Sequence, residues 1–348
     1  MLRRLPIDLY ILAMLAIVAL ASVLPAHGEG ARVAGWATNG AIAFLFFLYG
    51  ARLSPQAALA GLTHWRLHGV VLLCTYALFP LLGLAFGLLP PSVLPPQLYV
   101  GLVFLCVLPS TVQSSIAFTS IAKGNVAAAL CAASASNLLG VFATPLLVAA
   151  LLRTQGPGLS LGVLRDIALQ LLAPFLAGQI LRPWVGGFVA RHKAVLGLVD
   201  RGSILLVIFT AFSEGVTGGI WRQLKPADLA TLILCCCALL GVVLGLTALI
   251  SRRVMRFSRE DEIVVVFCGS KKSLASGLPM ASVLFAGPQV GLTVLPLMLF
   301  HQIQLMVCAA LARRYARGFV ATEEAGPEAA VERQAFGPAA SGGPSATS

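Results

Sequence analysis

The chain has 348 residues, of which 58% are hydrophobic and 11% charged, and its mean hydropathy is +0.92. Because a soluble domain carries roughly 25% charged residues, this composition excludes an ordinary water-soluble fold and indicates a polytopic membrane protein. The net charge of +11 comes from Lys and Arg at the ends of apolar segments. A nucleic-acid groove would instead need clustered basic residues with interleaved aromatics, so nucleic acid is not an expected partner.

Ten apolar segments follow one another along the chain, each long enough for a helix to cross a hydrocarbon core of ~30 Å. We therefore expect an all-α fold of ten transmembrane helices. The first segment also resembles a secretory signal peptide, but its length and Asp8 at its start favour a retained helix. The segments lie near residues 8–26, 33–52, 68–88, 97–122, 125–152, 163–181, 196–218, 227–250, 262–287 and 289–312.

The basic residues outside the apolar segments predict the orientation. Ten spans put both termini on one side, and assigning that side to the cytoplasm places 17 Lys and Arg inside and 5 outside, in agreement with the positive-inside rule. We expect a multi-pass protein of the inner or plasma membrane with both termini cytoplasmic. After Arg317 the chain becomes polar and rich in Gly, Pro and Ala, which predicts a disordered cytoplasmic tail over residues 318–348.

The number of spans also predicts an internal repeat. Five spans in each half give the halves opposite orientations, as in the inverted repeats of many secondary transporters. The first five-helix repeat would cover residues 1–158 and the second residues 159–317. An offset of 158 residues brings Asp8 onto Asp166, Ser114 onto Lys272 and Ser115 onto Ser273.

Two of the predicted spans are interrupted by helix-breaking and polar residues. Span four, QLYVGLVFLCVLPSTVQSSIAFTSIAKGN, turns polar after Pro109, and span nine is broken between Gly269 and Ser276 in VFCGSKKSLASGLPMA. Interrupted helices in corresponding positions of two halves indicate a transporter's binding site. Their unpaired backbone groups must face protein or a water-filled cavity, because lipid cannot satisfy them.

Lys271 and Lys272 lie inside the second interruption. Counted from Ile263, Lys271 is eight residues into the span, or about 12 Å at 1.5 Å per residue. A lysine near the centre of a membrane helix costs roughly 2.5–3.5 kcal/mol. No acidic residue occurs in either quoted stretch of the two broken spans, so the expected partners are backbone carbonyls, water and an anionic ligand. Alternatively, the lysines form a cytoplasmic anchor or are tied to carbonyls purely for folding.

Three motifs, CGSKKSLASGLPMA, AKGNVAAA after span four and LFHQIQLM in span ten, make this chain resemble the bile acid:sodium symporter family. The resemblance is strongest to its sodium/bile acid cotransporter 7-like branch and covers spans one to ten. It implies a panel domain of spans one, two, six and seven and a core domain of the other six. It also implies that broken helices four and nine cross in the core and that substrate binds between core and panel.

The sodium ligands that the resemblance implies are largely replaced in this chain. A glutamate precedes the break of span nine in sodium-coupled members, and Phe267 stands at that position here. The glutamine and asparagine that follow it match Lys271 and Lys272, and the span-five ligands fall near Ala129 and Ala133, with Ser134 and Asn137 close by.

These departures lead to a hypothesis about coupling. A lysine ammonium is a tethered cation that can occupy the place of sodium, and because burial favours the neutral amine, proton binding could replace sodium binding. The predicted function is secondary active transport of a small or amphipathic organic anion by alternating access, coupled to sodium or protons, without a resident metal or other cofactor. The predicted substrate-binding residues are Gln113, Ser114, Ser115, Lys271, Lys272, Ser273, His301 and Gln302, and the predicted cation-coupling residues are Lys271, Lys272, Ser134 and Asn137.

A second function remains open, that of a non-transporting or regulatory membrane protein affecting ion homeostasis or envelope and glycan assembly. An enzyme is not expected. GLSLG at residues 158–162 matches the nucleophile-elbow pattern, which has catalytic meaning only between a strand and a helix. The eight cysteines form no CxxC pair, so they indicate neither a disulfide framework nor a metal site. The sequence leaves open the substrate, the direction of transport and whether the chain forms a homodimer.

Overall fold

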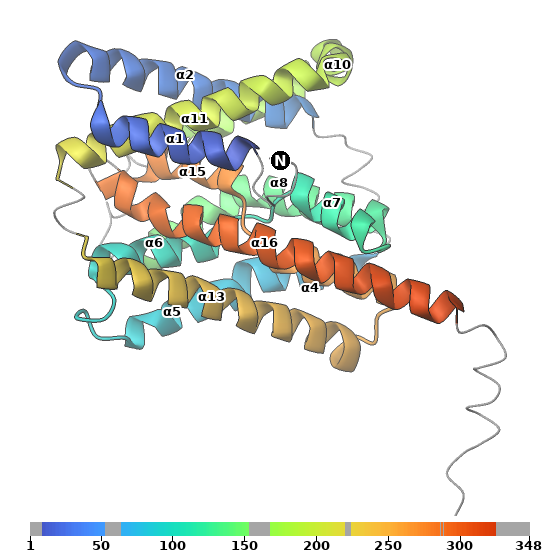
Figure 1. Ribbon diagram of the computed structural model, residues 1–348. Coiled ribbons are helices and arrows are strands. Elements are labelled where there is room, and N and C mark those ends of the chain that lie inside the picture. The colour runs from blue at the N-terminus through green and yellow to red at the C-terminus, as the bar shows by residue number, and fades with distance from the viewer. Residues whose placement is uncertain are drawn as a thin grey trace, which may run out of the picture.

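The computed structural model describes residues 9–52, 64–152, 168–219, 224–285, 287 and 289–324. These residues form helices joined by short connections, without a strand among them (Figure 1), and this confirms the predicted all-α fold. Asp8, Asp166 and the GLSLG motif lie outside the described residues.

The first half of the described chain contains both long and interrupted helices. Their bounds are α1 Leu9–Val23, α2 Gly28–Arg52, α4 Trp65–Leu73, the π-helical turn η2 Cys74–Leu78, α5 Phe79–Ala85, the 3-10 turn η3 Phe86–Leu88, α6 Pro96–Val107, α7 Gln113–Ile121 and α8 Val126–Leu151.

The second half of the described chain also contains long and interrupted helices. Its bounds are the π-helical turn η4 Ala168–Leu172, α10 Ala173–Arg191, α11 Lys193–Thr217, α13 Pro226–Leu249, the π-helical turn η5 Ile250–Val254, α14 Arg259–Gly269, α15 Leu274–Leu284 and α16 Gln289–Glu324. Helix α16 therefore continues past Arg317, where the sequence predicted the tail to begin, and residues 325–348 lie outside the described part.

By length and composition, six of these helical stretches can cross a membrane: Gly28–Arg52, Trp65–Leu88, Val126–Leu151, Lys193–Thr217, Pro226–Val254 and Val290–Gly318. Leu12–Val23 and Pro96–Val107 are shorter apolar helices. The remaining predicted spans correspond to α10 and to the α14–α15 pair, as Pro96–Val107 belongs to the interrupted pair α6–α7.

The helices form two layers. In Figure 1, α1, α2, α10 and α11 lie together above the other helices, and α1 packs on α11 while α2 packs on α10. These four helices correspond to the spans that the resemblance assigns to a panel domain. We call them the upper layer and the remaining helices the lower layer.

Two glycines bring the backbones of α2 and α10 into contact. A Cβ added at Gly50 would lie 2.1 Å from the carbonyl oxygen of Phe175, and one added at Gly178 would lie 2.1 Å from that of Phe47. The contact is therefore reciprocal, and each position requires a residue without a side chain. Small residues at helix contacts are typical of membrane proteins, because they let the backbones approach closely.

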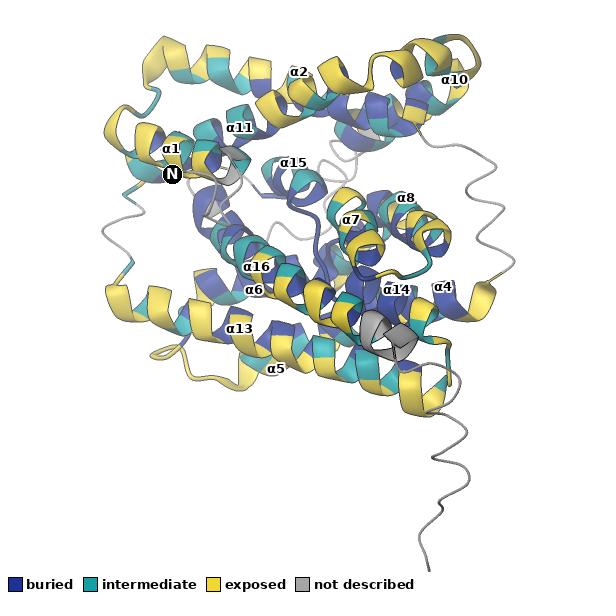
Figure 2. Cartoon of the chain, turned by 45° about the vertical axis from the view of Figure 1, so that its right-hand side comes forward, coloured by how far each residue is buried: buried dark blue, intermediate teal, exposed yellow. Residues whose placement is uncertain are grey.

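Burial is highest where the interrupted helices lie. Every residue of α6 from Val100 to Val107 is buried, as is every residue of α14 from Glu262 to Gly269. Large apolar side chains such as Leu73, Leu146 and Leu234 are exposed on outer helices, where Figure 2 shows exposed faces along α2, α10 and α13. This distribution suits a protein whose outer surface faces lipid and whose centre is protein.

Candidate functional site

The two helix interruptions lie against each other at the centre of the lower layer. Helix α6 ends before Pro109, because proline disfavours the helical conformation of the residue that precedes it. The Ser110 hydroxyl donates to the carbonyl of Cys268 at 2.6 Å, and the Ser273 N–H donates to the carbonyl of Pro109 at 2.8 Å. We call residues 108–112 and 270–273 together the crossing.

Four backbone carbonyls at the first interruption are paired with side chains. The Val107 carbonyl accepts from the Thr144 hydroxyl at 2.8 Å, and the Ser110 carbonyl accepts from the Asn137 side-chain amide at 2.6 Å. The carbonyls of Cys106 and Leu108 accept from the ammonium of Lys272 at 2.7 and 2.8 Å. Buried backbone groups need such partners wherever water is excluded, and here side chains supply them.

A third carbonyl for Lys272 comes from the π-helical turn η2. The N–H of Phe79 bonds to the carbonyl of Cys74, so it does not serve Thr75, and Pro80 has no N–H to offer. The Thr75 carbonyl is thereby left without a helical donor, and it accepts from Lys272 Nζ at 2.8 Å. The Phe79 ring completes the surroundings, with its centroid 4.1 Å from the same nitrogen.

Lys272 is therefore a fully buried cation held by backbone oxygens. An ammonium has three donors, and all three bond to carbonyls that come from two separate stretches of chain. Gln304 of α16 fixes the backbone at the same residue, accepting from the Lys272 N–H and donating to its carbonyl, both at 2.9 Å. Lys272 thus has carbonyl partners of the kind that the sequence predicted for both lysines.

Lys271 has the opposite surroundings, although it is the neighbouring residue and is equally buried. Its ammonium has no hydrogen-bond partner among the described residues. It lies 4.0 Å from the centroid of the Phe118 ring and 5.4 Å from that of Phe267, contacts that stabilise a cation by roughly 2 kcal/mol when desolvated. Because Phe267 stands where the resemblance implies a glutamate, no carboxylate there neutralises this charge.

The predicted substrate-binding residues of span four are divided by the fold. The Ser115 hydroxyl donates to the Phe267 carbonyl at 3.1 Å and so joins α7 to α14 beside the crossing. Ser114 lies beside it, with its hydroxyl 2.7 Å from that of Thr111. Gln113 begins α7 and is exposed.

The other predicted residues of spans nine and ten are Ser273, which precedes α15, and two residues of α16, His301 and Gln302. Ser273 caps α15, because its hydroxyl accepts from the Ser276 N–H at 3.2 Å. His301 Nδ1 lies 2.9 Å from the side-chain nitrogen of Gln304, which joins the histidine to the crossing. The side-chain oxygen of Gln302 is buried without a partner in the described part of the chain.

Of the two residues expected on span five, Asn137 reaches the crossing. Besides donating to the Ser110 carbonyl, it accepts from the Ser276 hydroxyl at 2.8 Å. The neighbouring bond is made by Ser136, whose hydroxyl accepts from the Ser110 N–H at 3.0 Å, and not by Ser134. A helix places such residues on different faces, and the sequence alone did not indicate which serine faces inward.

Other residues of the site were not among those predicted. Thr75 contributes its backbone carbonyl, which a pattern of side chains cannot predict. The one sequence signal is Pro80, five positions later, which has no N–H to pair with that carbonyl. Gln304 and Ser276 are polar at membrane depth, which is the signal that could have found them.

The sequence is similar to known membrane transport proteins. The model of the SBF-like CPA transporter family matches residues 8–317. An uncharacterized protein of Pseudomonas aeruginosa is 58% identical over 316 residues, 90% of this chain and 94% of that protein. A protein of Escherichia coli named "Putative symporter YfeH" is 50% identical over 311 residues, 89% of this chain and 93% of that protein.

A mammalian relative is more distant. Sodium/bile acid cotransporter 7 of Mus musculus is 28% identical over 277 residues, 78% of this chain and 80% of that protein. The resemblance inferred from the motifs is thus confirmed, and so is a membrane protein with several apolar helices. With its family model spanning both interrupted helices, the chain belongs to the SBF-like CPA transporter family.

Proposed function

We propose that the chain is a secondary active transporter of a small or amphipathic organic anion, in which Lys272 replaces a bound sodium ion. The chain would work by alternating access, with substrate between the upper and lower layers and both termini on the cytoplasmic side of the inner or plasma membrane. The observation that carries the proposal is the set of three backbone carbonyls around the Lys272 ammonium. Backbone carbonyls at an unwound helix are the groups that coordinate sodium in transporters of related plan.

The two lysines would have different roles. Lys272 has all three donors occupied, so it is a structural cation that holds the crossing together. Lys271 keeps an uncompensated charge between two aromatic rings, and this charge would attract an anion when the layers separate. Coupling to protons, rather than to sodium, would then proceed through Lys271.

The proposal includes a five-plus-five inverted repeat. The geometry of the crossing supports such a repeat. The bonded pair Ser110 and Cys268 is separated by 158 residues, the offset that also matches Ser115 to Ser273. Residues related by a two-fold axis come together where the axis passes, so such a contact is expected at the centre of a repeat. The pairing of α1 with α11 and of α2 with α10 has the same symmetry.

Thermal unfolding of the purified protein tests the proposal, in sodium and in choline, with taurocholate, octanoate and succinate as probes. A probe at 100 times its dissociation constant stabilises the protein by about 2.7 kcal/mol. We expect at least one anion to stabilise the wild type equally in both salts and to fail with Lys271→Met. Saturable uptake of that anion into proteoliposomes is the corresponding flux measurement.

Two results would contradict the proposal. Stabilisation that requires sodium would mean that a sodium site survives, for instance at Asn137, and that Lys272 does not replace it. Absence of saturable flux for every anion that binds would favour the alternative, a regulatory membrane protein without transport.

A further inference from the structure

A cavity of about 630 Å³ lies between α13, α14 and α16, apart from the crossing. Four residues of α13 at helical spacing form one wall: Gly241, Leu244, Gly245 and Ala248. Val307 and Leu311 of α16 also line the cavity. A Cβ added at Gly241 or Gly245 would meet nothing within 4 Å. The space beside these two positions is therefore open.

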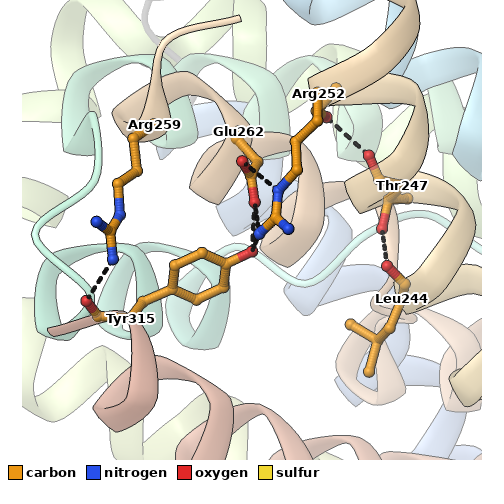
Figure 3. Close-up of polar contacts among 7 residues, drawn as sticks. Leu244, Thr247, Arg252, Arg259, Glu262 and Tyr315 are labelled. Atoms are coloured by element: carbon orange, nitrogen blue, oxygen red, sulfur yellow. Dashed lines mark hydrogen bonds and ion pairs between the residues drawn. The ribbon is translucent and has the colours of Figure 1, made fainter. Parts of the chain in front are cut away.

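Three arginines, Arg252, Arg259 and Arg314, line the same cavity. Arg252 holds Glu262 through two bonds of 2.8 and 2.7 Å, and the Tyr315 hydroxyl donates to the same carboxylate at 2.6 Å (Figure 3). The Arg252 side chain is nevertheless 58% exposed, whereas that of Glu262 is 7% exposed. The carboxylate is thus enclosed and its arginine remains accessible.

Two further arginines line this cavity. Arg259 donates to the backbone carbonyls of Tyr315 at 3.3 Å and Gly318 at 3.4 Å, and Arg314 is exposed. Residues 252–262 and 313–317 together contain seven arginines and three carboxylates. An anion with an apolar tail is the chemistry that fits both the arginines and the apolar walls.

We propose that this cavity binds an anionic phospholipid from the membrane leaflet at this end of α13. The phosphate would lie among Arg252, Arg259 and Arg314, and the first part of one acyl chain would follow the stripe of Gly241, Gly245 and their neighbours. Basic pockets between membrane helices bind lipid headgroups in this way, and the volume falls within the ≈300–1,000 Å³ of small-molecule sites. A free phosphate would leave the apolar walls unused.

The position of the cavity separates it from the proposed substrate path. Helix α13 lies on the opposite side of the molecule from α2 and α10 (Figure 1), whereas the substrate would bind between the layers. A lipid in the cavity would touch α14, the half-helix that leads to the crossing, and would hold it against α13 and α16.

The test is the thermal unfolding of the full-length protein in detergent, titrated with dioleoylphosphatidylglycerol or dioleoylphosphatidylcholine. We expect saturable stabilisation by the anionic lipid alone, and no effect of glycerol 1-phosphate or inorganic phosphate. Arg314→Gln removes an exposed charge and should weaken the apparent affinity about fivefold, as expected for one arginine near an anionic lipid. Gly245→Leu fills the cavity and should abolish saturation.

Two matched variants serve as controls. Arg253→Gln removes an arginine of the same segment that does not line the cavity, and Gly202→Leu adds a side chain to α11 at a position where a Cβ meets nothing within 4 Å. Both should bind the anionic lipid like the wild type. Equal affinity in Arg314→Gln, Gly245→Leu and the wild type would overturn the proposal. So would equal stabilisation by phosphatidylcholine or by glycerol 1-phosphate.

Discussion

Replacing Lys272 by methionine tests whether its ammonium holds the crossing together. Methionine has nearly the same length but donates no hydrogen bond, so Lys272→Met leaves the carbonyls of Thr75, Cys106 and Leu108 without the partner they have in the structure. Each buried, unsatisfied group costs about 1–3 kcal/mol, or roughly 3–9 kcal/mol for three. The variant no longer buries an ammonium, and this offsets part of the lost free energy. Against a typical stability of about 5–15 kcal/mol, the loss is large.

The assay is thermal unfolding in detergent, with Lys271→Met as the matched neighbour. Both lysines are fully buried, so the two variants differ in the hydrogen bonds lost and not in burial. We expect a much lower midpoint for Lys272→Met. The smaller Lys272→Ala leaves room beside the carbonyls, and sodium or methylammonium should then raise its midpoint more than that of the wild type. Equal midpoints for the two methionine variants, together with no response of Lys272→Ala to either cation, would refute the reasoning.

Three further predictions concern neighbouring features. Lys271→Met removes a buried charge without a hydrogen bond, so its unfolding midpoint should equal or exceed that of the wild type while stabilisation by organic anions is lost. Gln304→Leu removes both bonds to the backbone of Lys272 and should lower the free energy of unfolding by about 2–4 kcal/mol, measured by denaturant or thermal unfolding. Gly50→Ala should reduce the yield of folded protein in size-exclusion chromatography, because its Cβ would overlap the α10 backbone, whereas Gly40→Ala, with nothing within 4 Å, should not.

Each of these predictions has a distinct contrary result. A strongly destabilised Lys271→Met would mean that the ammonium has a partner which the structure does not show. An unchanged free energy of unfolding in Gln304→Leu would mean that the two hydrogen bonds from Gln304 are not needed to hold the backbone at Lys272. Equal yields for both glycine variants would mean that α2 and α10 can separate at little cost.

The positions of the two helix interruptions could be predicted from the sequence because their signals are local. Pro109 and the polar residues after it disfavour a continuous helix, and so do Gly269 and the serines near Lys272. Charge at membrane depth is costly wherever it occurs, so the two lysines indicated a site without knowledge of their partners. The structure contains both interruptions, with α6 ending at Val107 and α14 at Gly269.

The different surroundings of the two lysines could not be predicted, since they depend on contacts between distant segments. Thr75 is 197 residues from Lys272, and its carbonyl is available only because η2 shifts the helical hydrogen bonds by one residue. A π-helical turn has no clear sequence signal. Whether Ser134 or Ser136 bonds to the crossing depends similarly on the rotation of α8 about its axis. The sequence does not fix this rotation, because α8 is apolar on most of its faces.

The distance in sequence between Lys272 and its acceptors has a consequence for the order of assembly. During synthesis, the carbonyls of Thr75, Cys106 and Leu108 enter the membrane long before Lys272 exists. Until α14 and α15 are inserted, these oxygens lack the partner that the finished protein provides, and lipid cannot replace it. The first half of the chain can therefore reach its final packing only after the second half has arrived, so a fragment that stops after α13 should remain a substrate for membrane quality control.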